Sequence, residues 1–315
     1  MQESERDIFW EPGELPKPTR DTRQLLDDMH KWGYCLLADA IESKPLADIR
    51  ARLARQAEAE YHSGGYLENQ HIDSAAGHNQ WLMMLINKGE VFQQVLQHPD
   101  VTTVLNQVIG HEHILSETSA HLTRPGNPAM PLHTDQWWMP PPVMPGERAL
   151  PAGDITRTGV RTGPLKKATH PIPAPMCVQT MLMVSDFTDS NGGTRLVPGS
   201  HMTGYQPDQS VPHIVPSVPA EGPAGTIAMW EGRTWHSAGP NTSNEMRFGM
   251  PTLYAAPQMR TLMNFTYGTK REVLDKASPE LKQLLGFKVW QGYGSTGDTG
   301  NEWAAPAESL TGKLD

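Results

Sequence analysis

The spacing of apolar positions predicts helices mainly in the first third of the chain. Apolar side chains recur every three or four residues in four stretches, as is typical of helices: 21–32, 41–62, 89–97 and 99–109. The second stretch has the clearest pattern, with Leu46, Ile49, Leu53 and Ala57 on one face and Ser43 as the expected N-cap. One further short helix is expected to begin at Pro279.

From residue 111 onward the pattern changes to short apolar runs separated by glycine and proline. Strands are predicted at 114–124, 176–187, 194–201, 225–230 and 247–254, after an earlier one at 33–37. Residues 81–86 fit a strand or a short helical turn equally well. Early helices followed by strands of similar length favour a mainly β sandwich or barrel with flanking helices, rather than alternating βαβ units.

The same pattern suggests how the chain is divided. We expect a loosely held polar arm at 1–20, a single domain at 21–290 and a mostly irregular tail at 291–315. Residues 140–175 are rich in Pro, Gly and Thr and show little periodicity, which predicts a lid or binding loop, with local disorder as the alternative. A second loop, 64–79, is expected beside a site.

Composition narrows the class of protein. The formal net charge is −9 and no basic run occurs, so nucleic acid and anionic membranes are not expected as partners. No secretory signal and no bilayer-spanning apolar run is found, and Cys35 and Cys177 lie far apart, which together favour a cytoplasmic protein. The 16 methionines and 9 tryptophans indicate either core filling or a roomy apolar pocket. The oligomeric state is left open.

Candidate chemistry centres on His133 and Asp135. Side chains at i and i+2 lie on one face of a strand, so these two can bind the same metal. The segment that best supplies a third ligand ends at His236. Two histidines and one carboxylate form a facial triad that leaves open positions and suits non-haem Fe(II). A His-x-Asp pair alone is more often an ordinary hydrogen-bonded histidine.

Four stretches in order make the assignment more specific. They are 33–37 (GYCLL) followed by an amphipathic helix, 131–136 (PLHTDQ), 191–201 (NGGTRLVPGSH) and 232–247 with its histidine-to-arginine spacing. In these stretches, which span most of 30–255, the sequence resembles the phytanoyl-CoA dioxygenase family of Fe(II)/2-oxoglutarate oxygenases. The resemblance implies a double-stranded β-helix core, of the jelly-roll or cupin-like kind, and the use of O₂.

The resemblance also implies roles for particular residues. His133, Asp135 and His236 would bind Fe(II), and Arg247 would pair in a bidentate way with the distal carboxylate of 2-oxoglutarate, which suits a planar guanidinium. Thr194 would add a hydroxyl near the cosubstrate. Many relatives carry a hydroxyl residue where this chain has Ala238, so the contact to the second carboxylate stays open.

Asp135 bears on the type of reaction. Halogenating relatives have a small residue in place of this carboxylate, so its presence predicts oxygenation, most simply hydroxylation with release of succinate and CO₂. Desaturation, cyclisation and endoperoxidation use the same ligands and remain alternatives. A non-catalytic β-helix binding module is the alternative of a different class.

The residues that follow the ligands suggest a substrate. Trp137, Trp138 and Met139 either line the pocket or pack at the mouth of the barrel. If they line the pocket, they favour a small apolar or aromatic metabolite over a polar one.

Overall fold

Regular elements cover most of the segments predicted to be helix or strand. The computed structural model describes residues 7–64, 67–68, 79–210 and 215–304. The helices are α1 (Thr22–Trp32), α2 (Ser43–His62), α3 (Glu90–Val95), α4 (Pro99–Val108), α5 (Phe265–Gly268), α6 (Arg271–Leu274) and α7 (Pro279–Leu284). The strands are β1 (Tyr34–Leu37), β2 (Leu67–Glu68), β3 (Asn79–Met83), β4 (Ile114–Thr123), β5 (Cys177–Met183), β6 (Thr194–Leu196), β7 (Val218–Pro219), β8 (Ile227–Glu231), β9 (His236–Ala238) and β10 (Arg247–Ala255).

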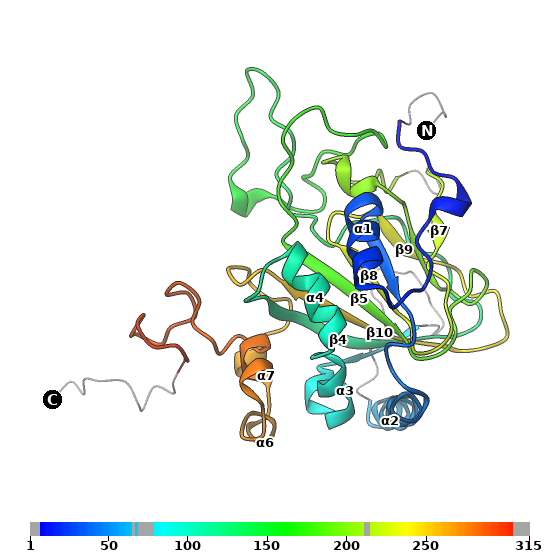
Figure 1. Ribbon diagram of the computed structural model, residues 1–315, viewed down its shortest axis with the longest axis vertical. Helices are drawn as coiled ribbons and strands as arrows, with labels where there is room; N and C mark the ends of the chain where they lie inside the picture. The colour runs from blue at the N-terminus through cyan, green and yellow to red at the C-terminus, as the bar shows by residue number, and fades with distance from the viewer. Residues whose placement is uncertain (1–6, 65–66, 69–78, 211–214, 305–315) are drawn as a thin grey trace.

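The strands form two antiparallel sheets. The large sheet has the order β1-β8-β5-β10-β4-β3-β2, and the small sheet has the order β7-β6-β9. Strands β1 to β5 all lie in the large sheet, and from β5 to β10 the chain then passes back and forth between the two sheets (Figure 1). This arrangement is the double-stranded β-helix core that the resemblance implies.

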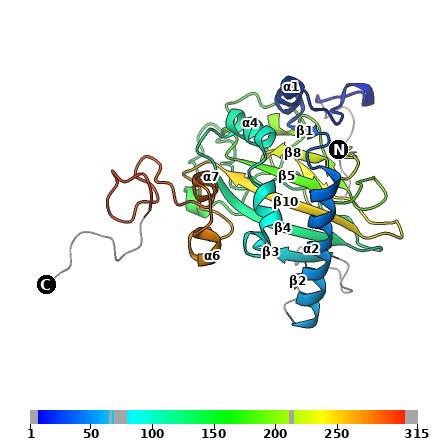
Figure 2. The same ribbon diagram turned by 60° about the horizontal axis from the view of Figure 1, so that its bottom comes forward.

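Both faces of the large sheet are buried, which explains its nearly continuous apolar strands. In β1, Cys35 and Leu37 belong to the large core that also contains side chains of α1 to α4, whereas Tyr34 and Leu36 belong to a second core. The second core contains residues of both sheets, including Leu196 of β6. Figure 2 shows α1, α2 and α4 lying across the outer face of the large sheet. The inner face is therefore left for a site between the sheets.

The N-terminal segment differs from its prediction. Ile8 is 4% exposed and packs with Leu165 and Trp235, and Thr19 forms a bridge to Leu37. The expectation of a loosely held arm is therefore wrong for residues 7–20. The polar and Pro-rich composition of this segment concealed the apolar side chains that anchor it, which are Ile8, Trp10 and Leu15.

Two other local predictions need correction. Glu42, not Ser43, is the N-cap of α2, and it makes no side-chain capping bond. Residues 81–86 combine both alternatives, because β3 ends at Met83 and a 3₁₀ turn (Leu85–Asn87) follows. The predicted loop 64–79 lies almost wholly outside the described residues.

The long segment at 140–175 contains one short 3₁₀ turn (Ala152–Asp154) among its irregular backbone. Its green loops extend beyond the sheets in Figure 1. Ile155 and Leu165 are nevertheless buried, and the amide of Gly163 donates to the carbonyl of Gln206. A lid role for this segment remains a prediction. None of the helices in the described ranges is long and apolar enough to cross a membrane.

Candidate metal centre

The two segments predicted to meet are joined by their backbones. His133 and His236 form an antiparallel bridge in which each amide donates to the other's carbonyl at 2.9 Å. His236 begins β9 in the small sheet, whereas His133 lies in an otherwise irregular stretch. The two histidines, 103 positions apart in sequence (236 − 133), are thus fixed directly opposite each other.

Asp135 completes a compact cluster with these two histidines. One ligand atom from each of the three side chains lies within 4.8 Å of the others. Nε2 of His236 is 3.5 Å from Oδ2 of Asp135, and the two imidazole rings have centroids 4.3 Å apart. Two imidazoles and a carboxylate at this spacing suit a divalent transition metal with open coordination positions.

Hydrogen bonds orient both imidazoles in the same way. Nδ1 of His133 lies 3.1 Å from the carbonyl of Pro131, and Nδ1 of His236 lies 2.9 Å from the carbonyl of Thr234. A carbonyl oxygen can only accept, so each Nδ1 carries the proton and each Nε2 keeps its lone pair. This tautomer presents Nε2 to a metal, as histidine ligands commonly do.

The electrostatics of the cluster favour a neutral His133 beside a charged Asp135. Burial, together with repulsion from His236, lowers the pKa of His133 to about 3. Burial alone would raise the pKa of Asp135, but the two histidines and Arg157 hold it below its ordinary value. The cluster therefore offers the protonation states that metal binding requires.

Trp230 of β8 holds the carboxylate in place. Its indole Nε1 donates to Oδ2 of Asp135 at 3.3 Å, and its ring centroid lies 5.0 Å from that of His236. The side chain is 2% exposed. The sequence analysis assigned it no role, although its position at the end of an apolar strand could have suggested one.

The backbone around Asp135 is anchored to the long 140–175 segment. The side chain of Gln136 donates to the carbonyl of Ala174 at 2.9 Å and accepts from the amide of Met176 at 2.7 Å. Arg157 donates to the carbonyl of Thr134 at 3.3 Å. These bonds couple the ligand-bearing stretch to the segment expected to contact substrate.

Arg247 begins β10 and is 3% exposed. One guanidinium nitrogen, Nη2, donates to Oγ1 of Thr123 at 2.6 Å. Nε and Nη1 have no hydrogen-bond partner in the described part of the chain, and burial lowers the Arg247 pKa to about 10. A buried cation with unsatisfied donors is costly, so the pair of free N–H groups fits an incoming carboxylate.

The metal-binding cluster, Trp230, Arg157 and Arg247 all line one cavity of about 510 Å³. Seven of the eight residues predicted to form the site line it: His133, Asp135, His236, Arg247, Thr194, Trp137 and Trp138. Met139 does not line it; this side chain is buried at 3% exposure elsewhere. The structure therefore does not support the expected substrate contact through Met139.

The cavity also contains polar residues outside the predicted ligand set, of which the sequence suggested only His121, as a minor alternative ligand. Glu117, Gln179 and Arg157 line it, as does His121, whose ring stacks on that of Trp81 at 4.5 Å. Burial, followed by the charge of Arg247, lowers the pKa of His121 to about 3. The alternation of Glu117, Ser119 and His121 along one predicted strand was the signal that could have revealed this wall.

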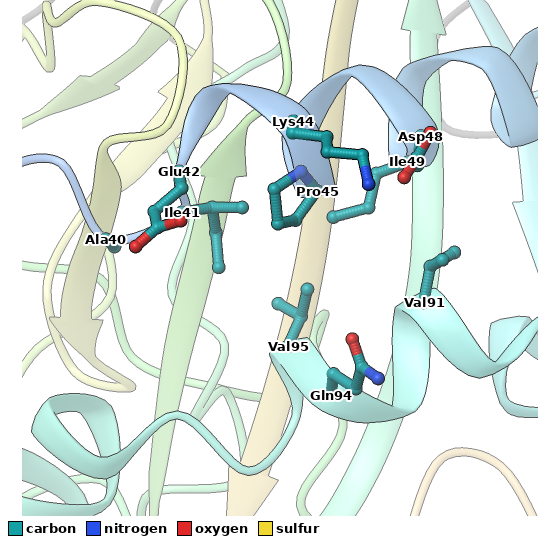
Figure 3. A pocket seen from close by; sticks show the side chains of 10 residues that line it. All are labelled: Ala40, Ile41, Glu42, Lys44, Pro45, Asp48, Ile49, Val91, Gln94 and Val95. Atoms are coloured by element: carbon teal, nitrogen blue, oxygen red, sulfur yellow. The ribbon is translucent and has the colours of Figure 1, made fainter.

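A second pocket, of about 340 Å³, lies away from this cluster. Pro45 and Ile49 of α2 face Val91 and Val95 of α3 across it, with the charged side chain of Lys44 at its edge (Figure 3). None of the predicted site residues lines it. It offers no group suited to the predicted chemistry.

Several known proteins are similar to this chain in sequence. Dioxygenase af480 of Aspergillus fumigatus is 28% identical over 201 residues, which cover 62% of this chain and 54% of that protein. Dioxygenase andF of Emericella variicolor is 30% identical over 125 residues, covering 40% and 43%. The uncharacterized protein Rv1501 of Mycobacterium tuberculosis is 23% identical, covering 84% and 86%. The chain thus spans about half the length of the fungal dioxygenases that it matches.

Solved structures share the fold at low sequence identity. The epimerase SnoN, in complex with Fe³⁺, alpha ketoglutarate and nogalamycin RO, gives a TM-score of 0.54 at 16% identity, covering 75% of this chain and 84% of that one. HygX of Streptomyces hygroscopicus, with nickel and 2-oxoglutarate bound, gives 0.55 at 12% identity, covering 76% and 89%. A sequence model of one family, "Phytanoyl-CoA dioxygenase (PhyH)", matches residues 29–249, which is most of the chain. The chain therefore belongs to the phytanoyl-CoA dioxygenase (PhyH) family.

Proposed function

We propose that this protein is an Fe(II)/2-oxoglutarate-dependent dioxygenase that hydroxylates a small molecule with a mainly apolar body. The observation that carries the proposal is the shared cavity. It brings a cluster of two histidines and one carboxylate, within 4.8 Å of one another, together with a buried arginine that has two free donor nitrogens. A binding module would have no need for this combination.

His133, Asp135 and His236 fit the proposed metal by chemistry as well as by spacing. Neutral imidazole nitrogens and one carboxylate oxygen suit Fe(II), and the three remaining positions leave room for a chelating cosubstrate and O₂. When bound, Fe(II) supplies the O₂ chemistry that inserts oxygen into a C–H bond while 2-oxoglutarate becomes succinate and CO₂. Trp230 and the two backbone carbonyls keep these ligands oriented.

Arg247 would bind the distal carboxylate of 2-oxoglutarate through Nε and Nη1, because these are its unpartnered donors. Thr194 lies directly across from Ala238 on the neighbouring strand, and both line the cavity. Its hydroxyl is therefore on the same face as the position where Ala238 lacks one. We assign Thr194 a hydrogen bond to the cosubstrate on this basis.

The substrate would occupy the remainder of the cavity. Trp137 and Trp138 pack edge to face with centroids 5.7 Å apart, and Arg157 lies over the Trp137 ring at 5.4 Å. These side chains would supply apolar contact and exclude water beside the metal.

One experiment tests this function directly. Anaerobic addition of Fe(II) and 2-oxoglutarate to the wild-type protein should give a weak visible charge-transfer band, and admission of O₂ should give succinate. His236→Ala should abolish both signals, whereas the matched control His62→Ala, on the exposed end of α2, should retain them. Full succinate formation by His236→Ala would remove this residue from the ligand set, and no band in the iron-loaded wild type would reject the chelation scheme.

Cyclisation is the second candidate reaction. SnoK, described as a non-heme alpha ketoglutarate dependent carbocyclase, matches this fold with a TM-score of 0.55 at 15% identity. The two reactions differ in product composition, because hydroxylation adds one oxygen atom and ring closure removes two hydrogen atoms. Mass spectrometry of the product formed under ¹⁸O₂ separates them.

A further inference from the structure

A row of side chains crosses the inner face of the large sheet at one end of the cavity. Leu253 of β10 pairs with Glu117 of β4 on one side and with Gln179 of β5 on the other. All three line the cavity. Residues paired across antiparallel strands point to the same face, so the two polar side chains flank an apolar one.

Glu117 keeps the cavity-facing register of His121, and a β-bulge directly before it marks this end of the row. The register shifts between Leu253 and Tyr254, so that Glu117 pairs with Leu253 while Leu115 pairs with Tyr254. Ser116 is the extra residue of β4, and it lets Leu115 enter the core beneath the helices while Glu117 faces the opposite side. Bulges that redirect a side chain occur often beside active sites.

The row lies too far from Arg247 to serve the cosubstrate. Arg247 and Leu253 are six residues apart on β10, which corresponds to roughly 20 Å at the rise of an antiparallel strand. 2-Oxoglutarate, held between Arg247 and the metal cluster, would not reach this end. Glu117 and Gln179 therefore belong to the substrate half of the cavity.

Hydrogen bonds within the protein leave most of the polar atoms of these two side chains open to the cavity. Glu117 accepts one hydrogen bond, from Oγ of Ser119 at 2.8 Å, and has no ion-pair partner among the described residues. Burial raises the Glu117 pKa, and the charge of Asp135 adds to this rise. Gln179 is 8% exposed, and its side-chain amide forms no hydrogen bond within the described ranges. Buried polar groups are normally satisfied, which points to a ligand that completes them.

We propose that the substrate is an apolar molecule carrying a hydrogen-bond donor, either a hydroxyl or a protonated amine, that is held by Glu117 and Gln179. The proposal rests on the proposed function. It makes the expected apolar substrate more specific. The wall around the row includes the apolar rings of Trp81 and Trp138, whereas Glu117 and Gln179 are polar. Anchoring the donor at the far end of the cavity would decide which C–H bond of the substrate faces the metal.

The test uses three probes that share one apolar cage: 1-adamantanol, 1-adamantanamine and 1-adamantanecarboxylate. Each is titrated anaerobically by calorimetry into the protein loaded with Fe(II) and 2-oxoglutarate. The alcohol or the amine should bind at least about tenfold more tightly than the carboxylate, as one hydrogen bond to a carboxylate allows. A preference for the amine identifies a cationic donor, and a preference for the alcohol identifies a neutral one.

Variants then show which side chains cause the difference in affinity among the three probes. Glu117→Leu should bring the probes to within about twofold of one another, and Glu117→Gln, which keeps the shape and an acceptor oxygen, should weaken the amine more than the alcohol. Gln179→Leu gives a second measurement on the same row. Glu58→Gln, on the exposed face of α2, is the matched control and should retain the wild-type ranking.

The outcomes separate the two proposals. If Fe(II) and 2-oxoglutarate themselves fail to bind the wild type, the proposed function fails. If both bind but the carboxylate binds as tightly as the donors, or no probe binds, the donor-bearing substrate class is overturned alone. The same conclusion follows if Glu117→Leu and Gln179→Leu both keep the wild-type ranking.

Discussion

The indole nitrogen of Trp230 lies 3.3 Å from Oδ2 of Asp135, on the side of the carboxylate that also approaches His236. A hydrogen bond of this kind fixes a ligand before the metal arrives, and its loss typically weakens metal binding ~10–100-fold. We predict that Trp230→Phe, which keeps the buried ring, raises the dissociation constant for Fe(II) by this factor. Anaerobic titration with Fe(II) measures it.

Trp290→Phe is the matched control, because Trp290 contacts Tyr293 far along the chain from the cluster. It should bind Fe(II) like the wild type. Equal Fe(II) affinity of Trp230→Phe and wild type would show that the indole N–H does not hold the ligand.

Arg247→Lys should weaken 2-oxoglutarate binding more than Fe(II) binding. A lysine keeps the charge but cannot present two parallel N–H groups, so we expect a ~10–100-fold rise in the dissociation constant for 2-oxoglutarate. Titration of the visible charge-transfer band with 2-oxoglutarate gives this constant. Arg271→Lys, which changes an exposed ion pair with Asp275, should leave it unaltered. If Arg247→Lys binds 2-oxoglutarate as tightly as the wild type, the two parallel N–H groups of Arg247 do not hold this cosubstrate.

Gly33→Ala should destabilise the fold. Gly33 ends α1 with a φ of 80°, and a Cβ there would lie 2.5 Å from Oγ1 of Thr234 and 2.6 Å from Nδ1 of His201. Backbone strain and overpacking together predict a loss of roughly 2–4 kcal/mol in the free energy of unfolding. Urea denaturation measures the loss. Gly13→Ala, where nothing lies within 4 Å, should cost far less, and equal midpoints for the two variants would contradict the close packing at Gly33.

Stability of the metal-free protein should fall as the pH is lowered below about 6.5. The His121 pKa is about 3 in the fold against 6.5 for the free side chain, so the unfolded chain takes up the proton first as pH falls. The contribution of His121 to the free energy of unfolding is fully present above the pKa of the unfolded chain. It decreases by up to about 1.4 kcal/mol for each pH unit below that pKa. His121→Phe keeps a ring against Trp81 and should flatten this slope. Unfolding curves from pH 5 to 8 in chelator test it, and identical slopes would exclude His121 as a source.

Much of the fold was readable from the sequence because local pattern and tertiary role coincide. The amphipathic period of α2 reflects one buried face, and the mainly apolar sequence of β5 reflects two buried faces. The site was predictable for a different reason. His133, Asp135, His236 and Arg247 all reach one cavity, and it was the order and spacing of whole motifs that pointed to them.

The missed features depend on contacts between distant segments. Ile8 lies in a mainly polar stretch, and its packing with distant residues, among them Leu165 and Trp235, makes it an anchor. Leu115 lies in the core although Glu117, two residues on, faces the cavity, because a bulge at Ser116 breaks the alternation that the sequence pattern assumes. Met139 follows two cavity-lining tryptophans in sequence, but the turn after Asp135 takes it away from the cavity.

The backbone bridge between His133 and His236 has a thermodynamic consequence. Bringing together residues 103 positions apart costs about 4 kcal/mol of loop-closure entropy, and the backbone hydrogen bonds of this bridge and of the β6–β9 pair act against that cost. We therefore expect that the fold does not depend on metal binding, in contrast to small domains that are unfolded without their metal. A chelator should strip the ion from a chain that stays folded, so that loss and reloading of iron can be as fast as ligand exchange itself.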